Sequence, residues 1–447
     1  MPFAVYVLGL AVFAQGTSEF MLSGLVSGIA DDLHVSIPDA GLLTSAFAVG
    51  MVVGAPLTAL LSRNWPRRRA LLFFLGVFVA VHVIGALTPG YGVLLATRVV
   101  GALANAGFWA VALVTALGMV EPSARARATS VVVGGVTLAC VVGVPAGALL
   151  GGHWGWRSAF WAVAVVSVPA LVAVARTIPD ERPATTGTET GAGVSAGHEL
   201  RALRRPRLLL TLLISALVQG ATFCAFAYLE PLVTRVTGFG AGWVPAVLAL
   251  FGVGSFIGVT VAGRIGDARP DALVAVGPVT LTLGWSALAL TAGNPVAALV
   301  LVLVQGALAF ATGTALISRV FRAAPDAPTM AGSFATAAFN IGAALGPWAG
   351  GLAIGGGYGF RAPAWTSAAL MALATVTAVL LRMVRRPAPV RGGAPARPVP
   401  PAPGPDRSAE QLEEADDVEE RQQAEHPDRQ EAEHRHHASE PRQVLPE

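Results

Sequence analysis

The chain has 447 residues, of which 54% are hydrophobic and 13% are charged, and its formal net charge is +3. Soluble proteins carry roughly 25% charged residues, so this composition excludes an ordinary soluble protein and indicates a membrane protein. The small positive charge gives no indication of nucleic-acid binding. The two cysteines, each in an apolar segment, predict neither a disulfide framework nor a metal site.

Apolar segments of about 20 residues, the length of helix that crosses a hydrocarbon core of about 30 Å, recur along residues 1–384. They are too long, and too uniformly apolar, for the alternating strands of a membrane β-barrel. We therefore predict an all-α integral membrane protein with twelve transmembrane helices in two pseudo-symmetric halves of six. The predicted spans cover residues 5–29, 41–61, 70–88, 91–118, 128–150, 158–177, 208–232, 243–263, 272–291, 295–318, 329–354 and 362–383.

The arginines of the connecting segments are unevenly distributed. They concentrate in the even-numbered connections and after the last span, whereas the opposite connections hold only Arg157, Arg235 and Arg361. Because basic loops stay on the cytoplasmic side, we predict a multi-pass cell-membrane protein with both termini in the cytoplasm. The first span lacks a basic leader, so we expect a membrane helix rather than a cleaved signal peptide.

Two polar segments interrupt or follow the apolar pattern. One is rich in Thr and Gly and divides the spans six and six, and the other is rich in Pro, Arg and acids and cannot form a core. Short sequences recur at a near-constant separation, as in Gln15-Gly16 and Gln219-Gly220, and indicate a duplicated unit. The predicted organisation is an N-terminal bundle (1–177), a cytoplasmic linker (178–206), a C-terminal bundle (207–384) and a disordered cytoplasmic tail (385–447).

The first span carries an acid within the sequence TSEFMLSGL. Glu19 precedes Asp31, which we expect at the outer surface, by about 18 Å of helix, so it should lie near the bilayer midplane. Gln15, Glu19 and Ser23 follow one another at helical spacing and should form one polar face. We predict that Glu19 binds a proton on one side of the membrane and releases it on the other. The alternative is a permanently neutral Glu, hydrogen-bonded to a neighbouring helix.

The third and fourth spans each contain one basic residue. His82 has no polar residue at helical spacing and is interpreted as a packed or lipid-facing histidine. Arg98 opens the fourth span on the face that also carries Asn105 and Trp109, and an arginine so close to hydrocarbon needs a carboxylate, a carbonyl group or water. We predict that Arg98 shares proton coupling with Glu19. The alternative is an interfacial Arg98 that reaches back to water.

The fifth span, GGVTLACVVGVPAGALLGG, combines many glycines with Pro145. Small residues let helices approach closely and the proline weakens the backbone ladder, so this span should bend against its neighbours. The eleventh span, NIGAALGPWAGG, repeats the pattern. Paired flexible spans suit rocking of one half against the other, whereas static packing would explain the glycines but not their pairing.

Further polar positions occur in the second half. Glu230 shares a predicted helix face with Gln219, Thr222 and Phe226, and because it lies near the outer surface it could recruit protons or substrate. Asn340 lies on a polar face of the eleventh span, where hydrogen bonding between helices is the alternative role. The predicted residues of the substrate cavity are Gln15, Ser23, Asn105, Trp109, Gln219, Thr222, Phe226 and Asn340.

These motifs resemble the major facilitator superfamily, and within it the twelve-span drug:proton antiporters, over residues 1 to about 384. GTSEFMLSGL resembles the first-span signature of that group, with Glu19 at its acidic position. RVVGALANAG resembles the fourth-span motif whose arginine is implicated in proton transfer, which corresponds to Arg98. GVPAGALLGG resembles the antiporter motif of the fifth span, which corresponds to Gly143, Pro145 and Gly147.

The loop after the second span, ALLSRNWPRRR, resembles the gating loop of the superfamily but departs from it. Arg63 stands where the motif has an Asp, and Pro66 replaces its Gly, while Arg67 and Arg68 supply the basic positions. The loop after the eighth span, GRIGDAR, keeps the spacing from Gly263 to Asp267. The first loop therefore departs from the charge pattern on which a conformational lock between these loops would rest.

The runs AVYVLGLAVFAQGTSEFMLSGL and GGHWGWRSAFWAV are similar to chloramphenicol-resistance exporters of this group. The resemblance implies export of a neutral, amphipathic drug in exchange for protons, with the proton gradient as energy source, no cofactor and no metal. The expected partners are the drug, protons and the lipid bilayer, and we expect a monomer. We expect no enzymatic activity, because Glu19 and Arg98 are the only convergent reactive groups. Export of sugars or other small metabolites, and a non-transporting membrane sensor, are the alternatives.

Overall fold

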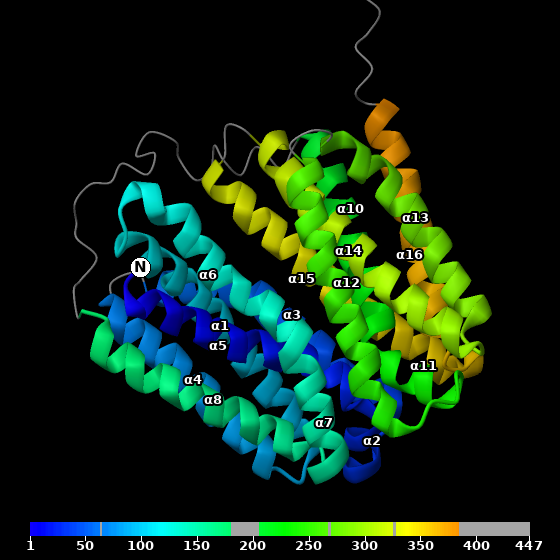
Figure 1. Cartoon of the computed structure of the whole chain (residues 1–447), viewed down its shortest axis with the longest axis horizontal. Helices are drawn as coiled ribbons and strands as arrows, with labels where there is room; N and C mark the ends of the chain where they lie inside the picture. Colours follow the sequence, from blue (N-terminus) through cyan, green and yellow to red (C-terminus); the bar gives the residue numbers. More distant parts are fainter. Residues whose placement is uncertain (63–64, 180–204, 267–269, 325–327, 384–447) are drawn as a thin grey trace, which may run out of the picture. The chain divides into compact units, whose positions relative to one another are not determined.

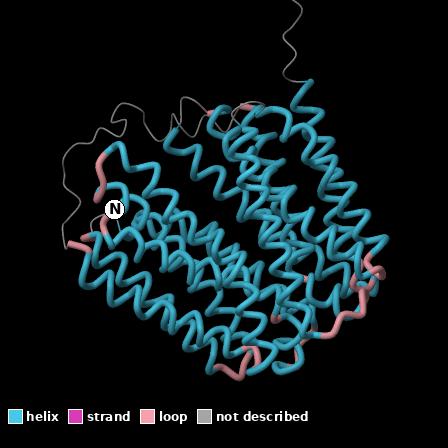
Figure 2. Tube along the Cα trace, viewed as in Figure 1, coloured by secondary structure: helices cyan, strands magenta, loops and turns pink. Residues whose placement is uncertain are grey.

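The computed structural model describes residues 1–62, 65–179, 205–266, 270–324 and 328–383. Within these ranges the chain consists of helices joined by short turns (Figure 2). Among the described residues, twelve helical spans are long and apolar enough to cross a membrane, which confirms the predicted fold class. Most of the predicted linker and all of the predicted tail lie outside the described residues, and their boundaries stay predictions.

The first half of the chain is coloured blue to teal in Figure 1. Its elements are α1 (Phe3–Phe20), η1 (Met21–Gly24), α2 (Val26–Leu33), α3 (Ile37–Ser62), α4 (Arg67–Leu87), α5 (Tyr91–Gly118), η2 (Pro122–Ala124), α6 (Arg125–Leu138), η3 (Ala139–Gly143), α7 (Val144–Trp154) and α8 (Arg157–Thr177). Helices α1, α4, α5 and α8 share one apolar core around Leu8, Phe74, Phe78, Phe108 and Phe160.

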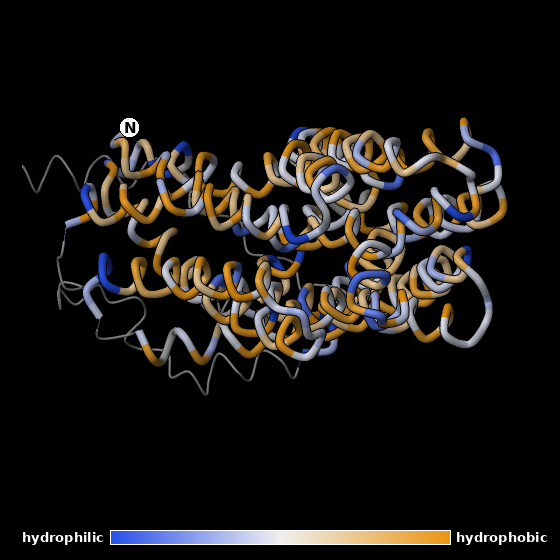
Figure 3. The backbone as a smooth tube through the Cα atoms, turned by 90° about the horizontal axis from the view of Figure 1, so that it is seen from below, coloured by the Kyte–Doolittle hydropathy of each residue, from blue (hydrophilic) through white to orange (hydrophobic). Residues whose placement is uncertain are grey.

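The second half is coloured green to orange. Its elements are α10 (Pro206–Ala227), α11 (Leu229–Arg235), η5 (Ala241–Trp243), α12 (Val244–Gly266), α13 (Pro270–Thr291), α14 (Pro295–Ala323), α15 (Pro328–Ala353), η6 (Ile354–Tyr358) and α16 (Ala362–Met383). A second apolar core forms around Phe226, Phe251, Trp285, Leu316 and Met371. Hydrophobic stretches recur along the helices of both halves (Figure 3), as expected for helices that face lipid on one side and a core on the other.

Two of the predicted spans are broken. The span predicted over residues 5–29 ends as an α-helix at Phe20 and continues through the 3₁₀ turn η1 into α2. A Cβ at Gly24 would lie 2.7 Å from Ala148 Cβ, so the turn brings the backbone directly against α7. The span predicted over residues 208–232 breaks at Tyr228, because Pro231 has no N–H to donate to the carbonyl of Ala227.

The fifth span is continuous but not uniformly α-helical. Its middle turn, η3, is π-helical and precedes Pro145 at the start of α7. A proline cannot supply the helical N–H to the preceding turn, and a widened turn accommodates the loss. The part of this span before the π turn, α6, already lies close to α1. A Cβ at Gly135 of α6 would lie only 2.9 Å from the backbone nitrogen of Phe13.

The two halves contact each other through α3 with α15, and through η3 and α7 with α12. Pro38 of α3 lies beside Gly351 of α15, and Ala48 packs with Ala343 further along the same pair of helices. At the same end of the molecule, α2 contacts α11. We call this region, in which α2 meets α11, the α2–α11 end.

The predicted internal repeat has a direct structural counterpart. Arg157 begins the last helix of the first half and donates a 3.0 Å hydrogen bond to the carbonyl of Thr88, just after α4. Arg361, just before the last helix of the second half, donates a 3.3 Å hydrogen bond to the carbonyl of Leu290, near the end of α13. Equivalent arginines therefore join equivalent helices in the two halves.

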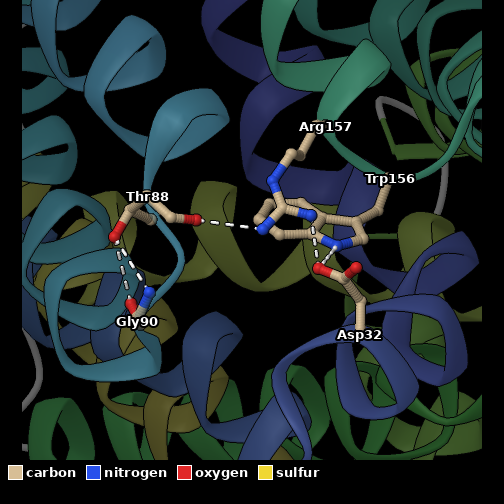
Figure 4. A network of polar contacts seen from close by, with 5 residues as sticks. All are labelled: Asp32, Thr88, Gly90, Trp156 and Arg157. Carbon is tan, nitrogen blue, oxygen red and sulfur yellow. Dashed lines mark hydrogen bonds and ion pairs between the residues drawn. The ribbon is translucent and has the colours of Figure 1, made fainter.

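Arg157 also belongs to a polar network at the surface (Figure 4). It forms an ion pair with Asp32, and the indole of Trp156 donates a 3.1 Å hydrogen bond to the same carboxylate oxygen. Hydrogen bonds hold the pKa of Asp32 below its usual value; the bond from Arg157 has the larger effect and the bond from Trp156 the smaller. The network therefore ties the end of α2 to the start of α8.

Candidate functional site

Glu19 lies in the last turn of α1 and is partly exposed. Its carboxylate forms no hydrogen bond or ion pair with the described residues. Arg98 is close enough to attract it electrostatically, without direct contact. This arrangement does not match the alternative of a Glu hydrogen-bonded to a neighbouring helix.

Arg98 is buried in α5, with 2% of its surface exposed, so the alternative of an interfacial arginine reaching back to water is wrong. Its two terminal nitrogens donate 2.8 Å hydrogen bonds to the hydroxyl and the carbonyl of Ser18. Its guanidinium carbon lies 4.5 Å from the ring centroid of Phe47, a cation–π contact. The Nε–H has no partner among the described residues, so the group keeps one donor free.

His82, on α4, also contacts the hydroxyl of Ser18. Its Nδ1 lies 2.6 Å from the carbonyl oxygen of Phe78, and its Nε2 lies 2.7 Å from the hydroxyl of Ser18. The side chain is buried, as the packed interpretation of the sequence expects, but it has a polar partner that helical spacing could not reveal. The sequence analysis did not identify Ser18, nor its contact with His82, because the two residues are 64 positions apart in the chain.

Gln15 and Asn105 are completely buried. The amide of Asn105 donates to the sulfur of Met51 at 3.4 Å, while its oxygen and both polar atoms of Gln15 have no partner within the described structure. Unsatisfied polar atoms in a membrane interior are costly, so a polar partner at these two positions would be favourable. Trp109, also predicted to line the cavity, is half-buried against the core of the first half.

The predicted polar stripe of α1 does not continue to Ser23. This residue belongs to η1, is buried, and donates its hydroxyl hydrogen to the carbonyl of Phe20 at 2.8 Å. The break of the helix after Phe20 is the physical reason, because spacing of i+4 places residues on one face only within a continuous helix. Gln15 and Glu19 alone keep that relation.

An aromatic cluster joins the halves next to Glu19. Phe20 of α1 packs on Phe223 and Phe226 of α10 at centroid distances of 5.6 and 6.4 Å, and Phe226 packs on Phe251 of α12 at 4.7 Å. Of these, the sequence analysis identified only Phe226. The rings of Phe223, Phe226 and Phe251 are buried and Phe20 is partly exposed, so the cluster is a packed aromatic contact between the two halves.

The other predicted cavity residues of the second half make local bonds. The hydroxyl of Thr222 is buried and donates to the carbonyl of Val218, within α10. Gln219 is half-buried on the same helix. Asn340 donates to the carbonyl of Thr336 on its own helix at 2.9 Å, and within the described residues it forms no hydrogen bond to another helix.

Glu230 joins the two halves at the α2–α11 end. Its Oε2 accepts hydrogen bonds from the hydroxyl of Ser27 at 2.6 Å and from the backbone N–H of the same residue at 3.2 Å. The predicted common face of Gln219, Thr222, Phe226 and Glu230 is wrong, because the chain breaks at Tyr228 and Glu230 belongs to α11.

The antiporter-motif residues allow α7 to approach α1 closely. A Cβ at Gly143 would overlap the hydroxyl of Thr17, and one at Gly147 would lie 3.2 Å from Met21 Cβ. Pro145 sits at the beginning of α7, directly after the π turn. These contacts explain the small residues by close packing of α7, η1 and α1.

The predicted gating loops are only partly described. Arg67 and Arg68 occupy the first turn of α4 and are half-buried, and a terminal nitrogen of Arg67 lies beside Gly118 at the end of α5. Gly263 is an exposed residue near the end of α12. Arg63 and Asp267 lie outside the described residues, so the charge lock in these loops stays a prediction.

In the described part of the chain, twelve helices long and apolar enough to cross a membrane form two repeated halves, and a buried arginine lies near an acid without a hydrogen-bonded partner. These features are those of a secondary membrane transporter. The family model of the Major Facilitator Superfamily matches residues 8–327 and 241–411, and the chain belongs to this superfamily. The resemblance read from its motifs is thereby confirmed.

Within that superfamily, the chain is 53% identical to the chloramphenicol resistance protein of Streptomyces lividans over 384 residues, which cover 86% of this chain and 97% of the relative. It is 35% identical to the inner membrane transport protein YdhP of Escherichia coli strain K12 over 358 residues, 80% of this chain and 90% of the relative.

Among solved structures, the fold is similar to a bacterial homolog of the human lysosomal transporter Spinster in an inward-facing, occupied conformation. The TM-score is 0.69 at 18% identity, over 87% of this chain and 98% of the other. At this identity the likeness shows the fold alone.

Proposed function

We propose that this chain exports chloramphenicol, or a similar amphipathic drug, in exchange for protons and thereby confers resistance. The 53% identity to the Streptomyces lividans protein, over nearly all of that relative, carries the substrate proposal. We also propose a monomer without a cofactor, driven by the proton gradient. Both termini lie in the cytoplasm, as the arginine distribution predicts, so the α2–α11 end faces outward.

Glu19 is the proposed proton carrier. Glu19 directly precedes Phe20, which packs on the second half, and its carboxylate is partly exposed and has no hydrogen-bond or ion-pair partner among the described residues. Arg98 is held on Ser18 rather than on Glu19, so the acid is free to exchange its proton with water. Export then requires that the bound drug and the proton on Glu19 exclude each other, so that each conformational cycle moves them in opposite directions.

The aromatic cluster around Phe20 and Phe226 is the proposed contact surface for the drug ring. It combines side chains of both halves, so a ligand bound there would be released when the halves rock apart. The amide of Gln15 and the amide oxygen of Asn105, which have no partner among the described residues, provide a donor and two acceptors for the polar groups of an amphipathic ligand. An apolar surface with a few polar groups suits a neutral drug better than a polyol.

The test measures chloramphenicol accumulation in a susceptible host that expresses the wild type, Glu19→Gln or Glu121→Gln, with and without a protonophore. Glu121 lies exposed beyond α5 and is the matched control acid. Wild type and Glu121→Gln should keep accumulation low until the protonophore is added, whereas Glu19→Gln should accumulate drug in both conditions. Active export by Glu19→Gln would contradict the proposal.

The stoichiometry can be tested in inside-out vesicles. If one carboxyl group exchanges one proton for one neutral drug molecule, transport moves a net charge across the membrane. Drug uptake should therefore respond to the membrane potential as well as to the pH difference. A response to the pH difference alone would contradict coupling through a single acid.

A further inference from the structure

Ser18, His82 and Arg98 form a buried chain of hydrogen bonds contributed by three helices, α1, α4 and α5. None of the three side chains is more than 2% exposed. The chain ends on the carbonyl oxygen of Phe78, 2.6 Å from His82 Nδ1. Its other end is the guanidinium group that attracts Glu19.

The direction of each bond follows from the chemistry of its ends. A carbonyl oxygen only accepts, so the Nδ1 of His82 must carry a hydrogen and donate it to Phe78. The Nε2 of a neutral imidazole is then an acceptor, and the hydroxyl of Ser18 donates to it. A guanidinium group only donates, so Arg98 donates to the remaining lone pairs of the Ser18 oxygen. Every link has one donor and one acceptor.

The surroundings of His82 suit this neutral form. The rings of Phe78 and Phe160 lie 4.2 and 5.8 Å from the imidazole, so its faces are apolar. Arg98 on α5 is the charged group that acts on it, and a second cation beside that guanidinium would be unfavourable. Among the described residues, Glu19 on α1 acts electrostatically on Arg98 and on the buried Cys140 of η3.

We propose that His82 is a positioning residue that acts through Ser18 to hold Arg98 away from Glu19. With its hydroxyl hydrogen on His82, Ser18 presents lone pairs to Arg98, and its carbonyl accepts the second terminal nitrogen. Without the Nε2 of His82 as acceptor, the Ser18 hydroxyl would rotate and no longer present its lone pairs to Arg98. The guanidinium group, whose Nε–H is already unpaired among the described residues, would then move toward the carboxylate of Glu19. An ion pair would keep Glu19 ionised and oppose its protonation.

This inference rests on proton coupling at Glu19 and adds a role for a residue on a third helix. It differs from a role of His82 as a proton carrier, because a positioning residue needs only an acceptor at Nε2. His82→Gln keeps an acceptor oxygen near that position but introduces a side chain that does not titrate. His82→Phe removes the acceptor and fits the aromatic surroundings of the site.

The experiment compares wild type, His82→Gln, His82→Phe and Ser18→Ala, with Ser167→Ala as control. Ser167 is equally buried but donates its hydroxyl hydrogen to Val163 of its own helix. In purified protein without drug, the labelling of Glu19 by dicyclohexylcarbodiimide, which reacts with protonated carboxyl groups, is followed against pH by peptide mass spectrometry. Drug–proton exchange by the same variants in proteoliposomes gives a second pH profile.

We expect His82→Phe and Ser18→Ala to shift the labelling midpoint to lower pH by about one unit or more, the effect of a cation brought next to a carboxyl group. His82→Gln and Ser167→Ala should keep the wild-type midpoint. An unshifted midpoint in His82→Phe and Ser18→Ala would overturn the proposal. So would a folded His82→Gln that behaves like His82→Phe, because His82 would then carry a proton itself.

The labelling experiment separates this inference from the proposed function. If the wild type exports drug without dependence on protons, proton coupling fails whatever the labelling shows. If the wild type is proton-coupled and the labelling midpoint is insensitive to His82 and Ser18, only the positioning role fails. Ser18→Ala preserves the test if His82→Phe does not fold.

Discussion

The hydrogen bonds between Ser27 and Glu230 connect the two halves at the α2–α11 end, and Ser27→Ala should weaken this connection selectively. The substitution removes the 2.6 Å hydroxyl bond and leaves the 3.2 Å backbone bond in place. A hydrogen bond to a charged group contributes about 1.5–3 kcal/mol. Since about 1.4 kcal/mol corresponds to a factor of ten, the equilibrium should shift by about 10- to 100-fold toward the form in which α2 and α11 are separated.

The shift can be measured by electron paramagnetic resonance between spin labels on Gly28→Cys and Gly240→Cys, which lie in opposite halves. A Cβ at either glycine has no atom within 4 Å, so both positions accept a side chain. The native thiols of Cys140 and Cys224 are buried and should not be labelled. Ser27→Ala should populate longer distances between the labels than the unsubstituted pair.

The matched control is Ser36→Ala, whose hydroxyl bonds to Asp39 three residues away, within the first half. Identical distance distributions for Ser27→Ala and Ser36→Ala would refute the reasoning. Glu230→Gln should lie between wild type and Ser27→Ala, because a neutral amide oxygen still accepts both bonds but accepts them more weakly.

Two further predictions concern stability and close packing. Hydrogen bonds from Arg157 and the neighbouring indole lower the pKa of Asp32, so their stabilisation is complete above the usual aspartate pKa of about 3.9 and is lost as the pH falls through the lowered value. Melting curves between about pH 5 and pH 3 should thus show a smaller acid-induced loss for Asp32→Asn than for wild type. A Cβ at Gly252 would overlap the carbonyl oxygen of Cys140 in the other half, so Gly252→Ala should reduce transport and destabilise by about 1–3 kcal/mol. Gly76→Ala, where a Cβ meets nothing, should change neither, and equal effects of the two alanines would contradict this account.

The sequence predicted the membrane helices well because their cause is local. About twenty apolar residues are needed to cross the hydrocarbon core, and each span meets this requirement within its own stretch of sequence. The prediction of continuous helices was wrong at two points, after Phe20 and at Tyr228, where helices break inside apolar segments. Hydropathy does not register such breaks, although Pro231 was a visible signal for the second.

The amino-acid sequence alone indicated the fold class, the repeat, and the positions of Glu19 and Arg98 inside predicted membrane spans. The contacts of these two residues became visible only in the folded chain. Arg98 lies on Ser18 rather than on the acid, His82 completes the chain from a third helix, and Glu230 reaches Ser27 across 203 positions. Helical spacing relates residues of one helix, whereas these contacts depend on how separate helices pack, and that is set by side-chain shape over the whole bundle.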